Sequence, residues 1–157
     1  MKESRIEKSP AGAFKAPPFV LYGDHHISQK FRIDASKLAS ISVTFVTFAN
    51  TQVSYPVMWQ LMEIRDGEKK KISEGSFDAK RAVDWEQQRL ALPPSLDSRG
   101  RTYEIIFRAE GKLDANQAIG LPLYSMTDTN GPVQPVVLSD GKTSVPLTLG
   151  LNFAYRE

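Results

Sequence analysis

The chain of 157 residues contains no cysteine and only two histidines. Without thiols it forms no disulfide, no cysteine–zinc site and no cysteine nucleophile. The histidines, His25 and His26, are adjacent, and adjacent residues of an extended chain point to opposite sides. Both rings therefore cannot chelate one metal ion well, so we expect no metal site here and an ordinary loop contact instead.

Long apolar runs are also absent. No stretch of about eighteen apolar residues exists, so we expect no transmembrane helix. No apolar segment follows the first lysines in the way that a secretory leader requires. Together with the lack of cysteine, this pattern favours a cytoplasmic location without membrane insertion.

The sequence has almost no excess of charge of either sign. Lys and Arg number 20 against 18 Asp and Glu, which leaves a net charge of +2. Residues 1–18 hold four basic and two acidic side chains, so the rest of the chain is neutral, with 16 of each. Nucleic-acid-binding domains usually carry a basic stripe, and we therefore expect no nucleic-acid partner. The run Lys69–Lys71 is interpreted as a solvated hairpin shoulder, with binding of an anionic partner as the alternative.

Residues 1–18 mix charge with proline, glycine and alanine and show no period. This composition predicts a flexible N-terminal tail or linker. The remaining residues, 19–157, have the size of one domain with a single core.

From residue 19 onward apolar residues recur at every second position, as in strands with one buried face. The pattern is clearest near the C-terminus, at Val145, Leu147, Leu149, Leu151, Phe153 and Tyr155. Asp66-Gly67 and Asp140-Gly141 lie between such runs and predict hairpin turns, and Pro146 predicts a strand edge or a strand start. About eight or nine such runs, with almost no helix, predict an all-β fold: a two-sheet antiparallel β-sandwich of jelly-roll type.

Trp85 is the main candidate for a binding site. Leu90 marks even positions as apolar, so an unbroken strand places Trp85 on the opposite face, beside Gln87 and Arg89. An indole stacks on the C–H face of a sugar ring, while amide and guanidinium groups bind its hydroxyls. The alternative is a β-bulge within this run that turns Trp85 into the core.

Gln60 is a further candidate for the same polar face. Its neighbour Trp59 alternates in step with Val57 and Leu61, which predicts that Trp59 is a core residue. Gln60 then points away from the core, and we expect it to join the carbohydrate-binding set.

Another candidate is the segment Tyr124–Gly131, in which an aromatic residue precedes small polar ones between two predicted strands. Loops at the rim of a sandwich often carry recognition residues, so Tyr124, Asp128 and Asn130 join the candidate carbohydrate-binding residues. Asp128 and Asn130 also supply oxygen ligands of the kind that calcium takes, although the acid density is too low for an EF-hand-like loop. The alternative is an ordinary surface loop, and we expect no other cofactor.

A small glycosidase or lyase is one alternative to a binding module. Glycosidases need two carboxylates about 5–10 Å apart. Four acidic residues lie in or beside predicted strands, namely Glu63, Asp84, Glu86 and Glu104. No spacing among them selects a pair, so no catalytic residue is assigned.

A structural or protein-interaction domain is the other alternative. Several apolar residues are out of phase with the predicted core, namely Val46, Phe48, Met58 and Met62. If they shared one surface, they would form an apolar patch able to dock another chain.

Short motifs along residues 27–155 carry a family resemblance. They are Gln29-Lys30-Phe31, Leu38-Ala39-Ser40-Ile41, Asp84-Trp85, Leu90–Leu92, Asp97–Tyr103 and Leu151–Tyr155. Together they resemble the β-sandwich accessory domains attached to bacterial glycosyltransferases and other cell-surface polysaccharide proteins. After Tyr124 the chain departs from that pattern, because residues 127–135 replace a glycine-rich stretch.

The resemblance implies a non-catalytic module that binds carbohydrate or polysaccharide, fused to or associated with a glycosyltransferase. It assigns no ligand residues. Membership of the Asp84-Trp85 pair in the family pattern would favour a packing role for Trp85 over a recognition role.

Overall fold

The computed structural model describes residues 3–8, 14–23, 25–48, 54–94, 96–109, 118–126, 133–139 and 142–156. In these ranges the chain forms strands and one short 3-10 helix, Ala79–Arg81, and no α-helix. The strands are β1 (Glu3–Lys8), β2 (Phe14–Val20), β3 (His26–Ile33), β4 (Leu38–Phe45), β5 (Pro56–Arg65), β6 (Glu68–Asp78), β7 (Glu86–Ala91), β8 (Arg101–Ala109), β9 (Gly120–Ser125), β10 (Val136–Val137), β11 (Ser144–Val145), β12 (Leu147–Thr148) and β13 (Asn152–Arg156). The predicted all-β fold is confirmed.

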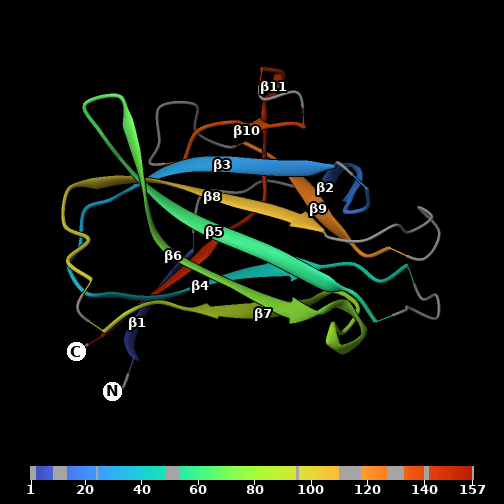
Figure 1. Ribbon diagram of the computed structural model, residues 1–157, viewed down its shortest axis with the longest axis horizontal. Coiled ribbons are helices and arrows are strands. Elements are labelled where there is room, and N and C mark those ends of the chain that lie inside the picture. Colours follow the sequence, from blue (N-terminus) through green and yellow to red (C-terminus); the bar gives the residue numbers. More distant parts are fainter. Residues whose placement is uncertain are drawn as a thin grey trace.

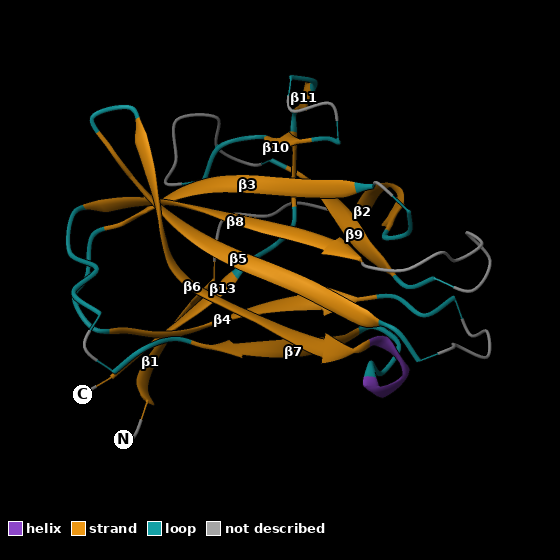
Figure 2. Ribbon diagram, viewed as in Figure 1, coloured by secondary structure: helices purple, strands orange, loops and turns teal. Residues whose placement is uncertain are grey.

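Two large antiparallel sheets form the layers of a sandwich (Figures 1 and 2). One has the strand order β1-β13-β4-β7 and the other the order β11-β10-β3-β8-β5-β6. A third sheet, β12-β9-β2, is joined to the end of β4 by a bridge between Val46 and Gly120. Strands distant in sequence lie side by side in every sheet, as the crossovers of a jelly roll require.

The core lies between the two large sheets because each strand buries alternate side chains. Phe45 of β4 meets Phe107 of β8 edge-on, with ring centroids 6.0 Å apart. Phe31 of β3 and Phe153 of β13 make a second contact across the layers at 5.0 Å. Trp59 is also buried, with only 6% of its surface exposed, so its predicted core position is confirmed.

The N-terminal segment differs from the sequence-based expectation. The tail predicted for residues 1–18 contains β1, which pairs with β13, and β2, which pairs with β9. Strand pairing at a sheet edge rests on backbone hydrogen bonds, which charged residues and proline in the sequence do not reveal. The expected tail is therefore wrong at residues 3–8 and 14–18.

The C-terminal run of alternating residues is not one strand. It is divided into β11, β12 and β13, which belong to three different sheets. Pro146 separates β11 from β12, which confirms the strand start expected there. Gly150 has a φ of +69°, and a Cβ at this position would lie 3.1 Å from the Tyr124 ring, so the chain turns where only glycine fits.

One hairpin turn predicted from the sequence lies within the described residues. Asp66 and Gly67 join β5 to β6, and both have positive φ, 53° and 78°. This backbone matches the twist of paired strands and favours Asp-Gly, so the prediction is confirmed. Asp140 and Gly141 lie outside the described residues.

Candidate functional site

Trp85 lies in the turn before β7 and is exposed to solvent. Its exposed fraction is 49%, whereas Leu90 is 2% exposed. Gln87 and Arg89 are exposed on the outer side of β7, as the alternation predicted. The alternative, a bulge that turns Trp85 into the core, is therefore wrong.

The backbone holds Trp85 in a left-handed conformation, with a φ of +61°. A bulky residue adopts this region at a cost of about 1–2 kcal/mol, so the surrounding contacts have to impose it. The amide of Trp85 donates to the Phe45 carbonyl at 2.9 Å, and the Asp84 carboxylate accepts from the Thr47 amide at 2.7 Å. Glu86 closes the turn by donating to the Val83 carbonyl. The indole is thus presented by a hydrogen-bonded turn.

Polar side chains follow the Trp85 turn along the outer face of β7 and β4. The strand register places Thr44 opposite Gln87 and Ser42 opposite Arg89, and directly opposed residues share a face. An amide, a guanidinium and two hydroxyls therefore line the outer face of β7 and β4, directly after the turn that carries Trp85. We call Trp85, Gln87, Arg89, Ser42 and Thr44 the β7 face.

Gln60 does not belong to the β7 face. It lies on β5, whose inward residues Trp59 and Leu61 are buried, so Gln60 faces outward from the six-stranded sheet. Its amide donates to Glu74 on the neighbouring strand β6 at 3.5 Å. The outer faces of the two layers point in opposite directions, so the expected grouping of Gln60 with Trp85 is wrong.

Tyr124, a further expected site residue, lies on β9 in the three-stranded sheet. It is half-buried, and its ring contacts Gly150. Asp128 and Asn130 lie outside the described residues, so the calcium expectation stays a prediction. Among the residues that are described, no three His, Asp or Glu side chains cluster in a way that could hold a metal ion.

The four acidic residues considered for glycoside hydrolysis occupy separate environments. Asp84 accepts a backbone hydrogen bond in the Trp85 turn, and Glu86 is exposed at the start of β7. Glu104 pairs with Lys69 at 2.9 Å on the outer side of the six-stranded sheet. Glu63 faces the interior between the layers. The structure does not bring these four carboxylates together.

The four residues expected to form an apolar patch for protein interaction lie in different parts of the molecule. Val46 is only 3% exposed because it bridges to β9. Phe48 is 37% exposed at the end of β4, whereas Met58 and Met62 are half-buried on β5 in the other layer. These residues do not share one surface.

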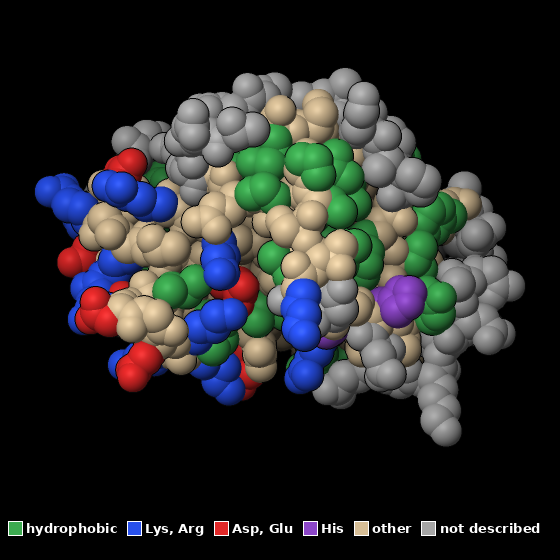
Figure 3. All heavy atoms as spheres, turned by 90° about the horizontal axis from the view of Figure 1, so that it is seen from above, with side chains coloured by type: hydrophobic (Ala, Val, Ile, Leu, Met, Phe, Trp, Pro, Cys, Tyr) green, Lys and Arg blue, Asp and Glu red, His purple; other side chains and the backbone are tan. Residues whose placement is uncertain are grey.

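The lysine run Lys69–Lys71 lies at the start of β6, exposed, as expected for the shoulder of a hairpin. Lys71 pairs with Glu74 at 3.2 Å, in addition to the pair between Lys69 and Glu104. Figure 3 shows basic and acidic side chains side by side on the face of the molecule that it draws. The lysines are thus partly neutralised by neighbouring carboxylates.

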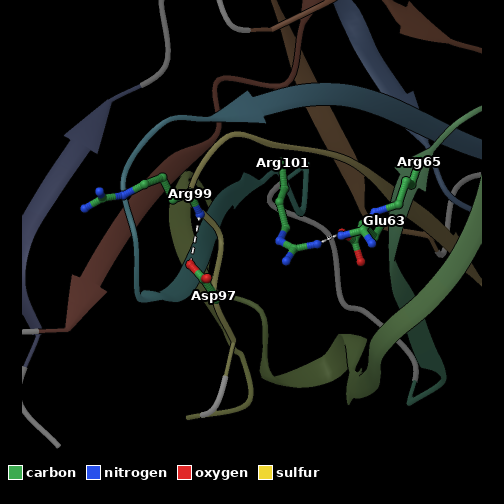
Figure 4. Close-up of polar contacts among 5 residues, drawn as sticks. All are labelled: Glu63, Arg65, Asp97, Arg99 and Arg101. Carbon is green, nitrogen blue, oxygen red and sulfur yellow. Dashed lines mark hydrogen bonds and ion pairs between the residues drawn. The ribbon is translucent and has the colours of Figure 1, made fainter.

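A cavity of about 330 Å³ lies where β5 and β8 meet the β7–β8 connection. Its lining residues are Glu63, Ile72, Pro93, Leu96, Asp97 and Arg101. Glu63 forms an ion pair with Arg101 and a second, longer one with Arg65 at 3.4 Å (Figure 4). The pairing with Glu63 raises the pKa of Arg101. We call this space the Glu63 cavity.

Asp97 borders the Glu63 cavity from the loop that leads into β8. It accepts a hydrogen bond from the Arg99 amide at 3.4 Å, while the Arg99 side chain extends away from the Glu63–Arg101 pair (Figure 4). Tyr103 lies directly opposite Glu63 in the β5–β8 ladder. Burial, and to a lesser degree the Glu63 charge, raises the pKa of Tyr103 to about 12.

Sequence reasoning missed this cavity, although the pattern contains its signal. The apolar phase of β5 runs through Trp59 and Leu61 and ends on Glu63. The apolar phase of β8 likewise begins with Arg101 before Tyr103. A charged residue can occupy the next inward position at the end of a strand. Its side chain then points into the open end of the sandwich, where it pairs with another charge or with a ligand.

The chain matches no family model and no curated protein in the comparisons made. Within the described part of the chain, no helix has the length and apolar character needed to cross a bilayer. The likeness to glycosyltransferase accessory domains therefore stays a prediction that rests on the short motifs alone.

Proposed function

We propose that this protein is a carbohydrate-binding β-sandwich whose ligand lies on the β7 face. The single observation that carries the proposal is Trp85, a large aromatic side chain held half-exposed by a left-handed turn. Exposed aromatic residues are normal on surfaces, but a strained backbone that presents one is a reason to look for function.

The chemistry next to Trp85 suits a sugar. An indole offers an apolar face for the C–H groups of a pyranose, and Gln87 and Arg89 extend donors and an acceptor toward its hydroxyls. Thr44 and Ser42 add hydroxyls on the adjacent strand. The flat outer side of a sheet fits the side of a polysaccharide chain and explains why the site needs no deep pocket.

The same proposal gives the protein a non-catalytic role beside an enzyme that builds or recognises polysaccharide. Its support is the likeness of the short motifs to accessory domains of glycosyltransferases, together with a binding surface formed by one edge of a sheet. In this role the module holds the polymer while a partner carries out the chemistry.

Electrophoresis through gels containing neutral polysaccharides tests the proposal. The panel includes a glucan, a mannan and a galactan, and we expect at least one of them to retard the protein. Trp85→Ala should weaken binding by about thirtyfold or more, since truncation of a central aromatic contact residue costs about 2 kcal/mol or more. Val83→Ala is the matched control, because Val83 is an exposed apolar residue of the same turn, 55% exposed.

Unchanged retardation of Trp85→Ala would contradict the proposal, as would free migration of the wild-type protein in every gel. Thermal unfolding of both variants checks the fold, and we expect small changes because both positions are exposed. Sedimentation at several concentrations addresses the interaction alternative. Self-association that Trp85→Ala abolishes, without sugar binding, would favour a protein-docking surface instead.

A further inference from the structure

We propose that the Glu63 cavity is a second binding site, which takes a single neutral, hydroxyl-bearing sugar ring. It lies beside the loop that follows β7, whereas Trp85 precedes β7, so the two sites are at opposite ends of this strand. The inference shares its ligand class with the proposed function but rests on different residues, and it can fail or hold independently.

The size and walls of the cavity fit one ring. Its volume of about 330 Å³ is at the lower end of the range of about 300–1,000 Å³ for small-molecule sites. Pro93, Leu96 and Ile72 supply apolar walls, each of them half-buried. Apolar walls with a few convergent polar groups are typical of small-molecule sites in general.

The charges of the cavity balance, which favours a neutral ligand. The lining contains two carboxylates, Glu63 and Asp97, and one guanidinium, Arg101. A second guanidinium, Arg65, lies outside the lining and pairs with the same carboxylate, Glu63, so the two carboxylates and two guanidiniums of this region carry no net charge. A charged ligand would disturb this pairing, whereas a hydroxyl can donate to a carboxylate and accept from a guanidinium at once.

The polar groups of the cavity are placed so that they can hydrogen-bond a ligand and select among sugars. The Glu63 and Arg101 side chains are 14% and 32% exposed, so their hydrogen bonds are partly shielded from water. Arg101 uses one terminal nitrogen for Glu63, and a guanidinium carries five N–H groups in all, which leaves donors for a ligand at the lining.

Tyr103 adds a polar group behind the Glu63–Arg101 pair. Among the described residues, its hydroxyl is the one buried side-chain polar atom that has no hydrogen-bond partner. Native proteins leave few such groups, and each one calls for a physical reason.

Methyl NMR spectra of Leu96 and Ile72 report directly on the occupancy of the cavity. We would titrate the full chain with the methyl glycosides of glucose, galactose and mannose, and with glucuronate and glucosamine as charged counterparts. We expect a neutral glycoside to shift both methyl signals, and Asp97→Ala to weaken this binding by about tenfold, the loss of one charge-assisted hydrogen bond. Asp34→Ala is the matched control, an exposed acidic residue that pairs with Arg32 and does not line the cavity.

Trp85→Ala separates the two sites. The inference predicts that this variant keeps the methyl shifts even when it loses retardation in polysaccharide gels. Absence of a shift with every neutral glycoside would overturn the second site, and so would equal binding by Asp97→Ala or a clear preference for a charged sugar. None of these results affects the gel test of the β7 face, so failure of one site is distinguishable from failure of the other.

Discussion

At the scale of single residues, Tyr103 occupies an inward position of an apolar strand pattern and buries a polar hydroxyl there. Its side chain is fully buried against Phe31, with ring centroids 5.8 Å apart. The phenol hydroxyl lies near Glu63, Arg101 and Asp97 but bonds to none of the described residues. The raised pKa keeps it neutral, which is the form that burial favours.

Tyr103→Phe is expected to alter the pH dependence of stability. The pKa of Tyr103 is about 12 in the folded protein and 10 for an unperturbed tyrosine. Below pH 10 the phenol is neutral in both states, so its ionisation takes nothing from the free energy of unfolding. Above pH 10 only the unfolded chain ionises, and the free energy of unfolding falls by about 1.4 kcal/mol per pH unit until the folded pKa is reached. Tyr103→Phe removes this contribution.

Urea unfolding of both proteins, from neutral pH to about pH 12, measures the difference. At neutral pH the variant should be equally stable or more stable by about 1 kcal/mol, because the unpartnered hydroxyl is gone. Other tyrosines and lysines titrate equally in both proteins and cancel in the comparison. Parallel pH profiles would show that burial does not perturb Tyr103.

At the scale of elements, β5 and β6 depend on a close contact between Gly75 and Trp59. These residues are directly opposed in the register. A Cβ at Gly75 would lie 2.7 Å from Cζ2 and 2.8 Å from Nε1 of the indole. The ring therefore lies over the neighbouring strand where only a residue without a side chain leaves room.

Gly75→Ala should destabilise the protein by about 1–3 kcal/mol, the usual cost of overpacking a core. The indole is rigid and buried, so it cannot move aside without disturbing the neighbouring strand. Ser76→Ala on the same strand is the control, since Ser76 is exposed, and should stay within about 0.5 kcal/mol of wild type. Chemical denaturation compares the two, and equal midpoints would contradict the contact.

Elements also show what alternation can and cannot predict. The period of two predicted strands from residue 19 onward, and the strands around Ile41, Trp59 and Ile105 fit it because each has one buried face. It did not show the second break of the C-terminal run, between β12 and β13, since that break depends on the positive φ at Gly150. Nor did it reveal β1 and β2, whose pairing depends on backbone hydrogen bonds to β13 and β9.

At the scale of the whole molecule, alternation predicted only part of the site. It correctly placed Gln87 and Arg89 on the outer side of β7, and Trp85 is exposed as expected, but the positive φ at Trp85 interrupts the alternation before β7 begins. Alternation also predicted correctly that the Gln60 side chain points away from the core. It could not show that Gln60 belongs to the six-stranded sheet, because alternation does not say to which sheet a strand belongs. For the Glu63 cavity, alternation carries a signal in Glu63 and Arg101, but the contact of β5 with the loop after β7, over thirty residues later, is in no local pattern.

Two separate surfaces result from this architecture. The β7 face presents an aromatic ring and polar side chains on the flat side of one layer. The Glu63 cavity lies in the mouth between the layers, beyond the other end of β7. The two proposed sites share no residue, so the proposals allow a polymer on the flat surface and a single ring in the cavity at the same time.

The indole N–H signals of the two tryptophans test the central claim most directly. Trp59 is buried and Trp85 is exposed, so a two-dimensional ¹H–¹⁵N spectrum contains one signal from each environment, assigned with Trp85→Phe. On titration with oligosaccharides of the retarding polymer, we predict that the Trp85 signal shifts and saturates while the Trp59 signal stays in place. An unchanged Trp85 signal at saturating oligosaccharide would contradict the account.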